Sequence, residues 1–105
     1  MEIRFYHYEQ FRQLQMSSKT SLGNRITKDE CDARIREAKQ IKLDTFYSEH
    51  GYYFCEECLT SQGRIDCSHT IGVGKAKQDG RTELCWDVEN IRLLCRSCHQ
   101  KHDRL

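Results

Sequence analysis

Four cysteines, arranged as two close pairs, are the residues of this chain best suited to chemistry. Cys55 and Cys58 form one pair and Cys95 and Cys98 the other, with two residues inside each pair. Each pair presents two sulfurs from one tight turn, and four thiolates complete a tetrahedral zinc site. The spacing therefore predicts one structural Zn²⁺ ion, against the alternative of four separate small buried apolar residues.

A zinc staple also suits the size and composition of the chain. A chain of 105 residues makes one small domain, and 37% hydrophobic against 31% charged residues leave little material for a self-sufficient core. The seven cysteines are an odd number, and no apolar leader follows Met1-Glu2. These features favour metal binding in a reducing compartment over a secreted disulfide scaffold. We expect a cytoplasmic protein without a membrane segment.

From residue 52 to residue 105 the chain resembles the HNH endonuclease family in its zinc-containing form. That form has a cysteine pair, a strand ending in a histidine, a loop, an asparagine and then Leu-Cys-x-x-Cys-His. The corresponding residues here are Cys55, Cys58, His69, Asn90 and Leu94-Cys95-Arg96-Ser97-Cys98-His99. The segments Cys67-Ser68-His69 and Glu89-Asn90 are most similar to phage recombination nucleases of the NinG type. The resemblance implies a zinc-stapled ββα-metal (His-Me finger) domain that cleaves DNA, with branched or recombination DNA as a candidate substrate, in a bacterial or phage-infected cell.

The roles of two residues between the cysteine pairs follow from the chemistry of phosphodiester hydrolysis. The reaction needs a base that deprotonates water and a cation that neutralises charge on the phosphate. His69 suits the first role, because the pKa of imidazole lies near neutral pH. Asn90 would hold the loop that carries His69 through backbone hydrogen bonds, or would bind the metal directly. Outside this framework His69 would be a hydrogen-bonded structural histidine and Asn90 a turn or cap residue.

A second divalent cation, Mg²⁺ or Mn²⁺, is expected on the closing helix. His99 and Asp103 are four residues apart and share a helix face, and His102 competes with Asp103 for the same role. Many family members have an Asp or His ligand directly before the general base, but here that residue is Ser68. Asp66 shares the strand face of Ser68 and is the candidate substitute, directly or through water.

A different grouping of the same residues gives a protein without catalysis. Cys67 and His69 are a legitimate pair of zinc ligands. With Cys85 and either His99 or His102 they would close a second zinc site, in a module that binds DNA or a protein. The nuclease would hold one firm zinc ion and one exchangeable cation, whereas the module would hold two firm zinc ions. Outside such a site, the cysteines beyond the two pairs are simple apolar packing residues, namely Cys31, Cys67 and Cys85.

Global charge does not identify a nucleic-acid partner, because the formal net charge is only +1. Local charge says more, since basic residues crowd the Gly-rich segment 72–80 and the C-terminal end. The candidate DNA contacts are Lys75, Lys77, Arg81 and Arg96. The plainer interpretation is an ordinary solvated surface.

The expected architecture is α+β, with a helical extension over residues 1–51 before the zinc-containing domain of residues 52–105. Thr27-Lys28-Asp29-Glu30 is a capping box that predicts a helix start, with Glu30 reaching back to the Thr27 amide. No proline or glycine follows before Gly51, which suits a left-handed helix end. This long helix would cover the zinc domain with the apolar side made by Cys31, Ile35, Ala38 and Phe46.

Alternation predicts a strand over residues 64–71, with Ile65, Cys67, His69 and Ile71 on one face. A second strand is expected over 91–94 and a helix from Cys95 through Arg104. Segments 17–24 and 72–80 are expected to be loops, the latter flexible. Residues 1–17 fit neither period cleanly, and their aromatic side chains are the candidate contact of a homodimer.

Overall fold

The computed structural model describes residues 18–103; the segments 1–17 and 104–105, and with them the proposed homodimer contact, lie outside the described part. The described chain mixes helices with two small antiparallel sheets, as an α+β fold requires. The elements are β1 (Ser18–Lys19), β2 (Arg25–Ile26), α2 (Lys28–His50), β3 (Ile65–His69), α3 (Val73–Gln78), the 3-10 helices η1 (Thr82–Trp86) and η2 (Val88–Asn90), β4 (Ile91–Cys95) and α4 (Arg96–Asp103).

The long helix α2 begins and ends where its caps predict. The Thr27 hydroxyl accepts a hydrogen bond from the Glu30 amide at 3.2 Å, and Gly51 ends the helix with φ of 79°. Only half of the expected capping box forms, because the Glu30 carboxylate pairs with Arg34 at 3.1 Å instead of reaching back to Thr27. An ion pair one turn ahead thus replaces the second capping bond.

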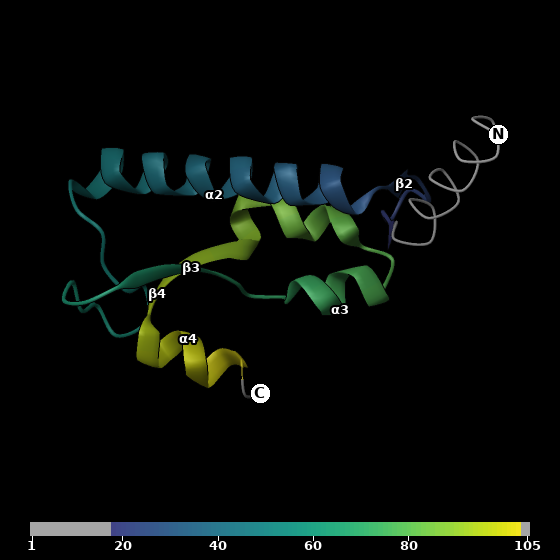
Figure 1. Cartoon of the computed structure of the whole chain (residues 1–105). Helices are drawn as coiled ribbons and strands as arrows, with labels where there is room; N and C mark the ends of the chain where they lie inside the picture. Colours follow the sequence, from purple (N-terminus) through teal and green to yellow (C-terminus); the bar gives the residue numbers. More distant parts are fainter. Residues whose placement is uncertain (1–17, 104–105) are drawn as a thin grey trace, which may run out of the picture.

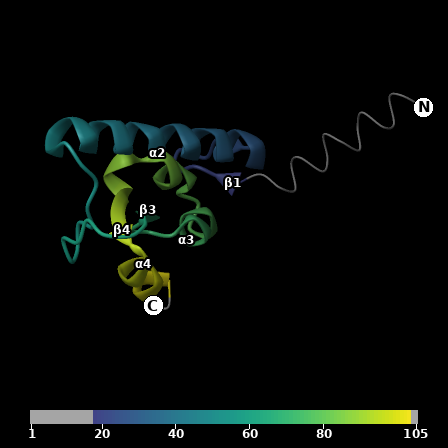
Figure 2. The same ribbon diagram turned by 60° about the vertical axis from the view of Figure 1, so that its left-hand side comes forward.

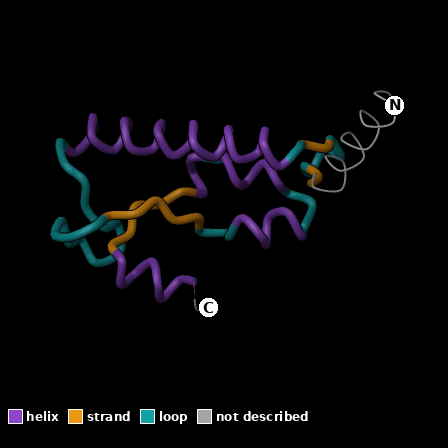
Figure 3. The backbone as a smooth tube through the Cα atoms, viewed as in Figure 1, coloured by secondary structure: helices purple, strands orange, loops and turns teal. Residues whose placement is uncertain are grey.

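The β3–β4 hairpin lies between α2 on one side and α4 on the other (Figure 1, Figure 2). The strands are antiparallel, with Ile65 opposite Cys95 at one end and His69 opposite Ile91 at the other. Strand β3 is shorter than the predicted 64–71, since pairing stops at His69. Helix α4 starts immediately after Cys95, so the chain from β3 to α4 is a β-strand, an insert, a second β-strand and a helix (Figure 3).

Two predicted loops are in fact partly ordered as secondary structure. The segment 72–80 contains α3 rather than a flexible loop, because Ala76 is fully buried and Val73 packs beside it in the core. That burial outweighs the cost of about 1 kcal/mol for Gly74 inside a helix. The segment 17–24 leads through a turn between β1 and β2, where the Gly23 amide donates to the Thr20 carbonyl at 3.0 Å.

The buried residues form two clusters rather than one core. The first joins α2 to the insert and contains Ile26, Cys31, Ala76 and Cys85. The second surrounds the cysteine pairs and contains Cys55, Leu94, Cys95 and Cys98, with Ile65 packed against it. Because α2 shares the first cluster with the insert, the helix is part of the scaffold that positions the insert. No helix in residues 18–103 has the length and apolar character that crossing a membrane requires.

Candidate functional site

The two cysteine pairs meet at one end of the hairpin. The sulfur atoms of Cys55, Cys58, Cys95 and Cys98 all lie within 4.8 Å of one another, and those of Cys58 and Cys95 are 3.6 Å apart. Tetrahedral zinc with bonds of 2.3 Å would separate its sulfurs by about 3.8 Å. The four cysteines are therefore placed as a structural metal ion such as zinc requires.

The first cysteine turn is tight and strained. The Cys58 amide donates to the Cys55 sulfur at 3.4 Å, and the Leu59 amide donates to the Cys55 carbonyl at 2.9 Å. Leu59 has φ of 68°, the only positive value among the described non-glycine residues. A leucine seldom adopts this conformation, so the surrounding contacts must hold it there.

The thiols of this cluster differ in how readily they ionise. Burial opposes ionisation of Cys55, but backbone amides of Cys58, Cys95 and Glu57 outweigh it and lower its pKa to about 6. Burial, together with the neighbouring thiols, raises the pKa of Cys98 to about 12. One thiolate thus forms easily near neutral pH, whereas a full set of four requires a cation to hold the charges together.

The described side chains do not form a second ligand cluster of this kind. Among residues 18–102, the four cysteines are the only group of three or more Cys, His, Asp or Glu donors that lie so close together. The donors predicted for a second closed zinc site, namely Cys67, His69, Cys85 and either His99 or His102, do not form such a group among the described residues. Cys85 is instead buried in the first core cluster, where its sulfur lies 3.9 Å from the Val73 carbonyl.

His69 stands at the opposite end of β3, half-buried and held by one hydrogen bond. Its Nε2 lies 2.7 Å from the Cys85 carbonyl oxygen. A carbonyl can only accept, so Nε2 carries the proton and Nδ1 bears the lone pair. Burial lowers the pKa of His69, the Cys85 carbonyl opposes this, and the positive charge of Lys39 adds to the lowering. The ring is therefore neutral near pH 7, with one basic nitrogen.

Asn90 is buried and ties together the insert that follows His69. Its Oδ1 accepts from the Ile71 amide at 2.9 Å, while its Nδ2 donates to the carbonyls of Ile71 at 3.0 Å and Leu84 at 2.9 Å. Its own carbonyl accepts from the Thr70 amide at 2.8 Å. Both side-chain polar atoms are thus engaged with the backbone, as the loop-holding role of Asn90 requires.

His69 and His99 line the same cleft, which has a volume of about 340 Å³. Helix α2 contributes one wall, β3 another and the first turn of α4 a third. The lining residues are Ile35, Lys39, Cys67, Ser68, His69, Gly72, Val73 and His99. The hairpin and the closing helix therefore bring the two histidines of the sequence prediction into one cavity.

Asp66 orients His99 from beside the cleft. Its Oδ2 lies 3.2 Å from His99 Nδ1 and 3.1 Å from an Arg96 nitrogen, and its Oδ1 accepts from Arg64 at 2.7 Å. Burial opposes ionisation of Asp66, but hydrogen bonds from these three residues prevail and lower its pKa. Since Asp66 is absent from the cleft lining, its geometry is that of a carboxylate acting on a histidine ligand.

His102, another predicted ligand on α4, does not line the cleft. His102 Nε2 accepts from Arg92 at 3.0 Å and lies 3.6 Å from a Glu57 carboxylate oxygen, and His102 is not among the cleft residues. The side chain of Asp103 lies outside the described part of the chain. Of the two proposed helix ligands whose side chains are described, His99 is thus the one that lines the cleft beside His69.

The candidate DNA contacts differ in their local partners. Lys75 pairs with Asp79 on α3 at 3.2 Å, and Arg96 is engaged with Asp66. Lys77 is half-buried on α3, and Arg81 is exposed just before η1. None of these lines the cleft, whereas Lys39 of α2, which sequence reasoning did not single out, does. Its spacing of four residues from the apolar Ile35 was the available signal.

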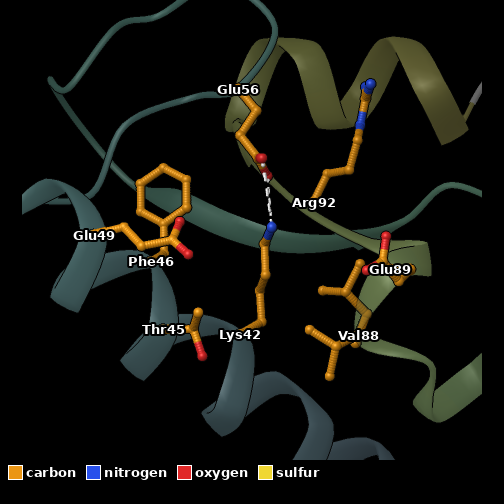
Figure 4. A pocket seen from close by; sticks show the side chains of 9 residues that line it. Lys42, Thr45, Phe46, Glu49, Glu56, Val88, Glu89 and Arg92 are labelled. Atoms are coloured by element: carbon orange, nitrogen blue, oxygen red, sulfur yellow. Dashed lines mark hydrogen bonds and ion pairs between the residues drawn. The ribbon is translucent and has the colours of Figure 1, made fainter.

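A second cleft, of about 360 Å³, lies between the C-terminal half of α2 and the η2–β4 segment (Figure 4). Lys42 crosses it to reach Glu56 at 3.4 Å, and Glu56 also accepts from the Leu93 amide at 2.6 Å. Its central charges are therefore paired with each other, and no histidine lines it. The histidine cleft is the better candidate for catalysis.

Comparison of the chain with protein-family models, with curated proteins and with solved structures found no match.

Proposed function

We propose that this protein is a metal-dependent DNA endonuclease of the HNH type, with His69 as the general base. The observation that carries the proposal is the 2.7 Å hydrogen bond from His69 Nε2 to the Cys85 carbonyl, in a cleft shared with His99. That bond directs the proton to Nε2 and presents Nδ1 as the basic atom. A purely structural role for His69 would not account for a second histidine that lines the same cavity.

In the proposed reaction a water molecule in the cleft attacks the scissile phosphorus and gives its proton to His69 Nδ1. The P–O bond on the opposite side breaks, and its electron pair leaves with the departing oxygen. The lowered pKa of His69 keeps the ring neutral at physiological pH, which a base requires. Asn90 keeps the insert fixed, and with it the Cys85 carbonyl that orients the ring.

His99, held through Nδ1 by Asp66, would bind the second divalent cation through Nε2. Mg²⁺ usually retains several water ligands and needs few from the protein, so one or two protein donors are compatible with it and with Mn²⁺. Such a cation supplies charge neutralisation at the phosphate and at the leaving oxygen. Ser68 is buried beside the site and has no role in this scheme.

The test is a nicking assay on supercoiled plasmid with Mg²⁺ or Mn²⁺, comparing the wild type with His69→Ala and His50→Ala. His50 is an exposed histidine at the end of α2 and serves as the matched control. The wild type and His50→Ala should nick the plasmid, whereas His69→Ala should lose about 100-fold or more in rate. Zinc content should be unchanged in His69→Ala, and the variant should remain folded.

Two results would overturn the proposal. One is equal nicking by the wild type and His69→Ala, which would identify a contaminating nuclease. The other is DNA binding without cleavage in any divalent metal, which would identify a zinc-stapled binding module. His99→Ala and His102→Ala refine the metal assignment, because only His99 lines the cleft. We expect the first to raise the Mn²⁺ concentration needed for half-maximal rate and the second to leave it unchanged.

A further inference from the structure

Lys39 is a half-buried cation that faces the histidine cleft without an anionic partner. It lies on α2, one turn after Ile35, and both residues line the cavity with His69 and His99. No hydrogen bond or ion pair to its ammonium group is found within residues 18–103. Partly desolvating a charge is costly unless an opposite charge or a hydrogen-bond acceptor compensates it.

Other lysines of the same helix show what a compensated charge looks like. Lys28 pairs with Asp32 at 2.9 Å on the exposed surface, and Lys42 pairs with Glu56 at 3.4 Å. Lys42 is only three residues from Lys39 and is also half-buried. Among the three lysines of α2, the one without a described partner is thus the one that lines the histidine cleft.

The charge of Lys39 is felt by the side chains of the cleft. It adds to the effect of burial in lowering the pKa of His69, and it opposes the effect of burial on the pKa of Cys67. A cation that already acts on the general base is close enough to act on an anion bound beside it. The Lys39 ammonium, on the wall of the cleft formed by α2, is available to donate hydrogen bonds to such an anion.

We propose that Lys39 binds the scissile phosphate of DNA and stabilises the charge that develops on it. This inference rests on the proposed nuclease function and assigns α2, outside the HNH-like segment, a catalytic residue. The ammonium would contact a non-bridging phosphate oxygen while water attacks from the side of His69. Because the lysine comes from a different element than His69 and His99, the packing of α2 against the insert completes the site.

The first arm of the test measures binding without chemistry. A fluorescent DNA duplex is titrated with the zinc-loaded protein in EDTA concentrations that leave the cysteine-bound zinc in place, using the wild type, Lys39→Met, Lys39→Arg and Lys28→Met. Lys39→Met should weaken binding about 10-fold and reduce the salt dependence by about one phosphate contact. Lys39→Arg, which keeps the charge, should restore most of the affinity, and Lys28→Met should bind as the wild type does.

The second arm measures single-turnover cleavage with saturating protein and Mn²⁺. Lys39→Met should lose about 100-fold in rate, with Lys39→Arg intermediate. The proposal is overturned if Lys39→Met binds duplex as the wild type does, or if Lys28→Met is equally impaired. A wild type that binds but never cleaves would refute the nuclease, and the binding arm would still decide whether Lys39 is an anion site. Lys39→Gln replaces Lys39→Met if the latter melts at a lower temperature.

Discussion

The two ends of the β3–β4 hairpin carry two different kinds of site. At the end where Ile65 faces Cys95, four identical donors from two tight turns lie within 4.8 Å of one another. At the end where His69 faces Ile91, the cleft is assembled from α2, β3, the insert and α4. The cysteine end therefore consists of two tight turns whose four sulfurs could hold a metal ion, whereas the histidine end depends on contacts between distant segments. The comparison teaches that one hairpin keeps the cysteines expected to stabilise the fold apart from the histidines proposed for catalysis.

The largest expected effect breaks the cysteine end. Cys95→Ser should leave the domain unfolded at 25 °C, because zinc binding contributes on the order of 10 kcal/mol and a small domain has little stability to spare. Metal analysis and circular dichroism measure this unfolding, and we expect both the zinc ion and the helical signal to be lost. Cys67→Ser is the matched control, since Cys67 lies on β3 outside the cysteine cluster. A folded, zinc-free Cys95→Ser protein would show that the cluster is not the staple.

Asn90→Ala should loosen the histidine end while leaving the metal in place. The substitution removes three side-chain hydrogen bonds and leaves partly buried backbone groups of Ile71 and Leu84 without these partners. A loss of about 3 kcal/mol in the free energy of unfolding is expected. Urea denaturation with parallel zinc analysis measures both quantities. Loss of zinc from the Asn90→Ala protein before urea unfolds it would instead mean that the stability of the cysteine end depends on the histidine end.

The same division explains what the sequence could predict. The cysteine pairs and the Thr27 and Gly51 caps are local patterns, so their geometry follows from residues close in the chain. The strand that ends at His69 was also recognisable, because alternating side chains mark it. The hydrogen bond from His69 to the Cys85 carbonyl joins residues sixteen apart through an insert without a repeating pattern. Spacing alone contains no information about such a contact.

Two examples show where tertiary packing overrides local preference. Glycine and lysine content made 72–80 look like a flexible loop, yet Ala76 is buried against Cys31 and Cys85 and α3 forms. His102 and His99 are three residues apart and share a helix side, yet Arg92 and Glu57 attract His102 away from the cleft. In each case a partner distant in sequence decided the outcome.

Acidification probes the histidine end, where His69 has a lowered pKa. Burial is the largest cause that lowers the pKa of His69 below its ordinary value of 6.5. The cleavage rate should therefore stay level below pH 6.5 and fall about tenfold per pH unit only below the lowered pKa. Folding behaves alike: the unfolded chain takes up the proton near 6.5 and the native ring does so only at lower pH. The stabilising contribution of the neutral ring is thus complete above pH 6.5 and is lost as pH falls through the lowered pKa.

A pH–rate profile in single-turnover conditions measures this effect, with His69→Gln as the control for the stability measurement. Lys39→Met should move the acid limb of the rate toward pH 6.5, because removal of the positive charge favours the protonated ring. An acid limb at or above pH 6.5 in the wild type would contradict the burial of His69. It would also remove the electrostatic link between α2 and the cleft.

The smallest effect tests whether α2 supports only the histidine end. Thr27→Ala removes the acceptor of the Glu30 amide and should cost about 1 kcal/mol, whereas Thr27→Ser keeps it. Fraying of α2 would begin one turn before Cys31. Cys31 is buried together with Cys85, and the Cys85 carbonyl accepts the hydrogen bond from His69. Amide exchange should therefore accelerate in the η1 segment and not at Cys55 or Cys98. The exposed Thr45→Ala on the same helix should change neither. Equal acceleration at both ends would mean that the hairpin transmits the disturbance and that the two sites share one cooperative unit.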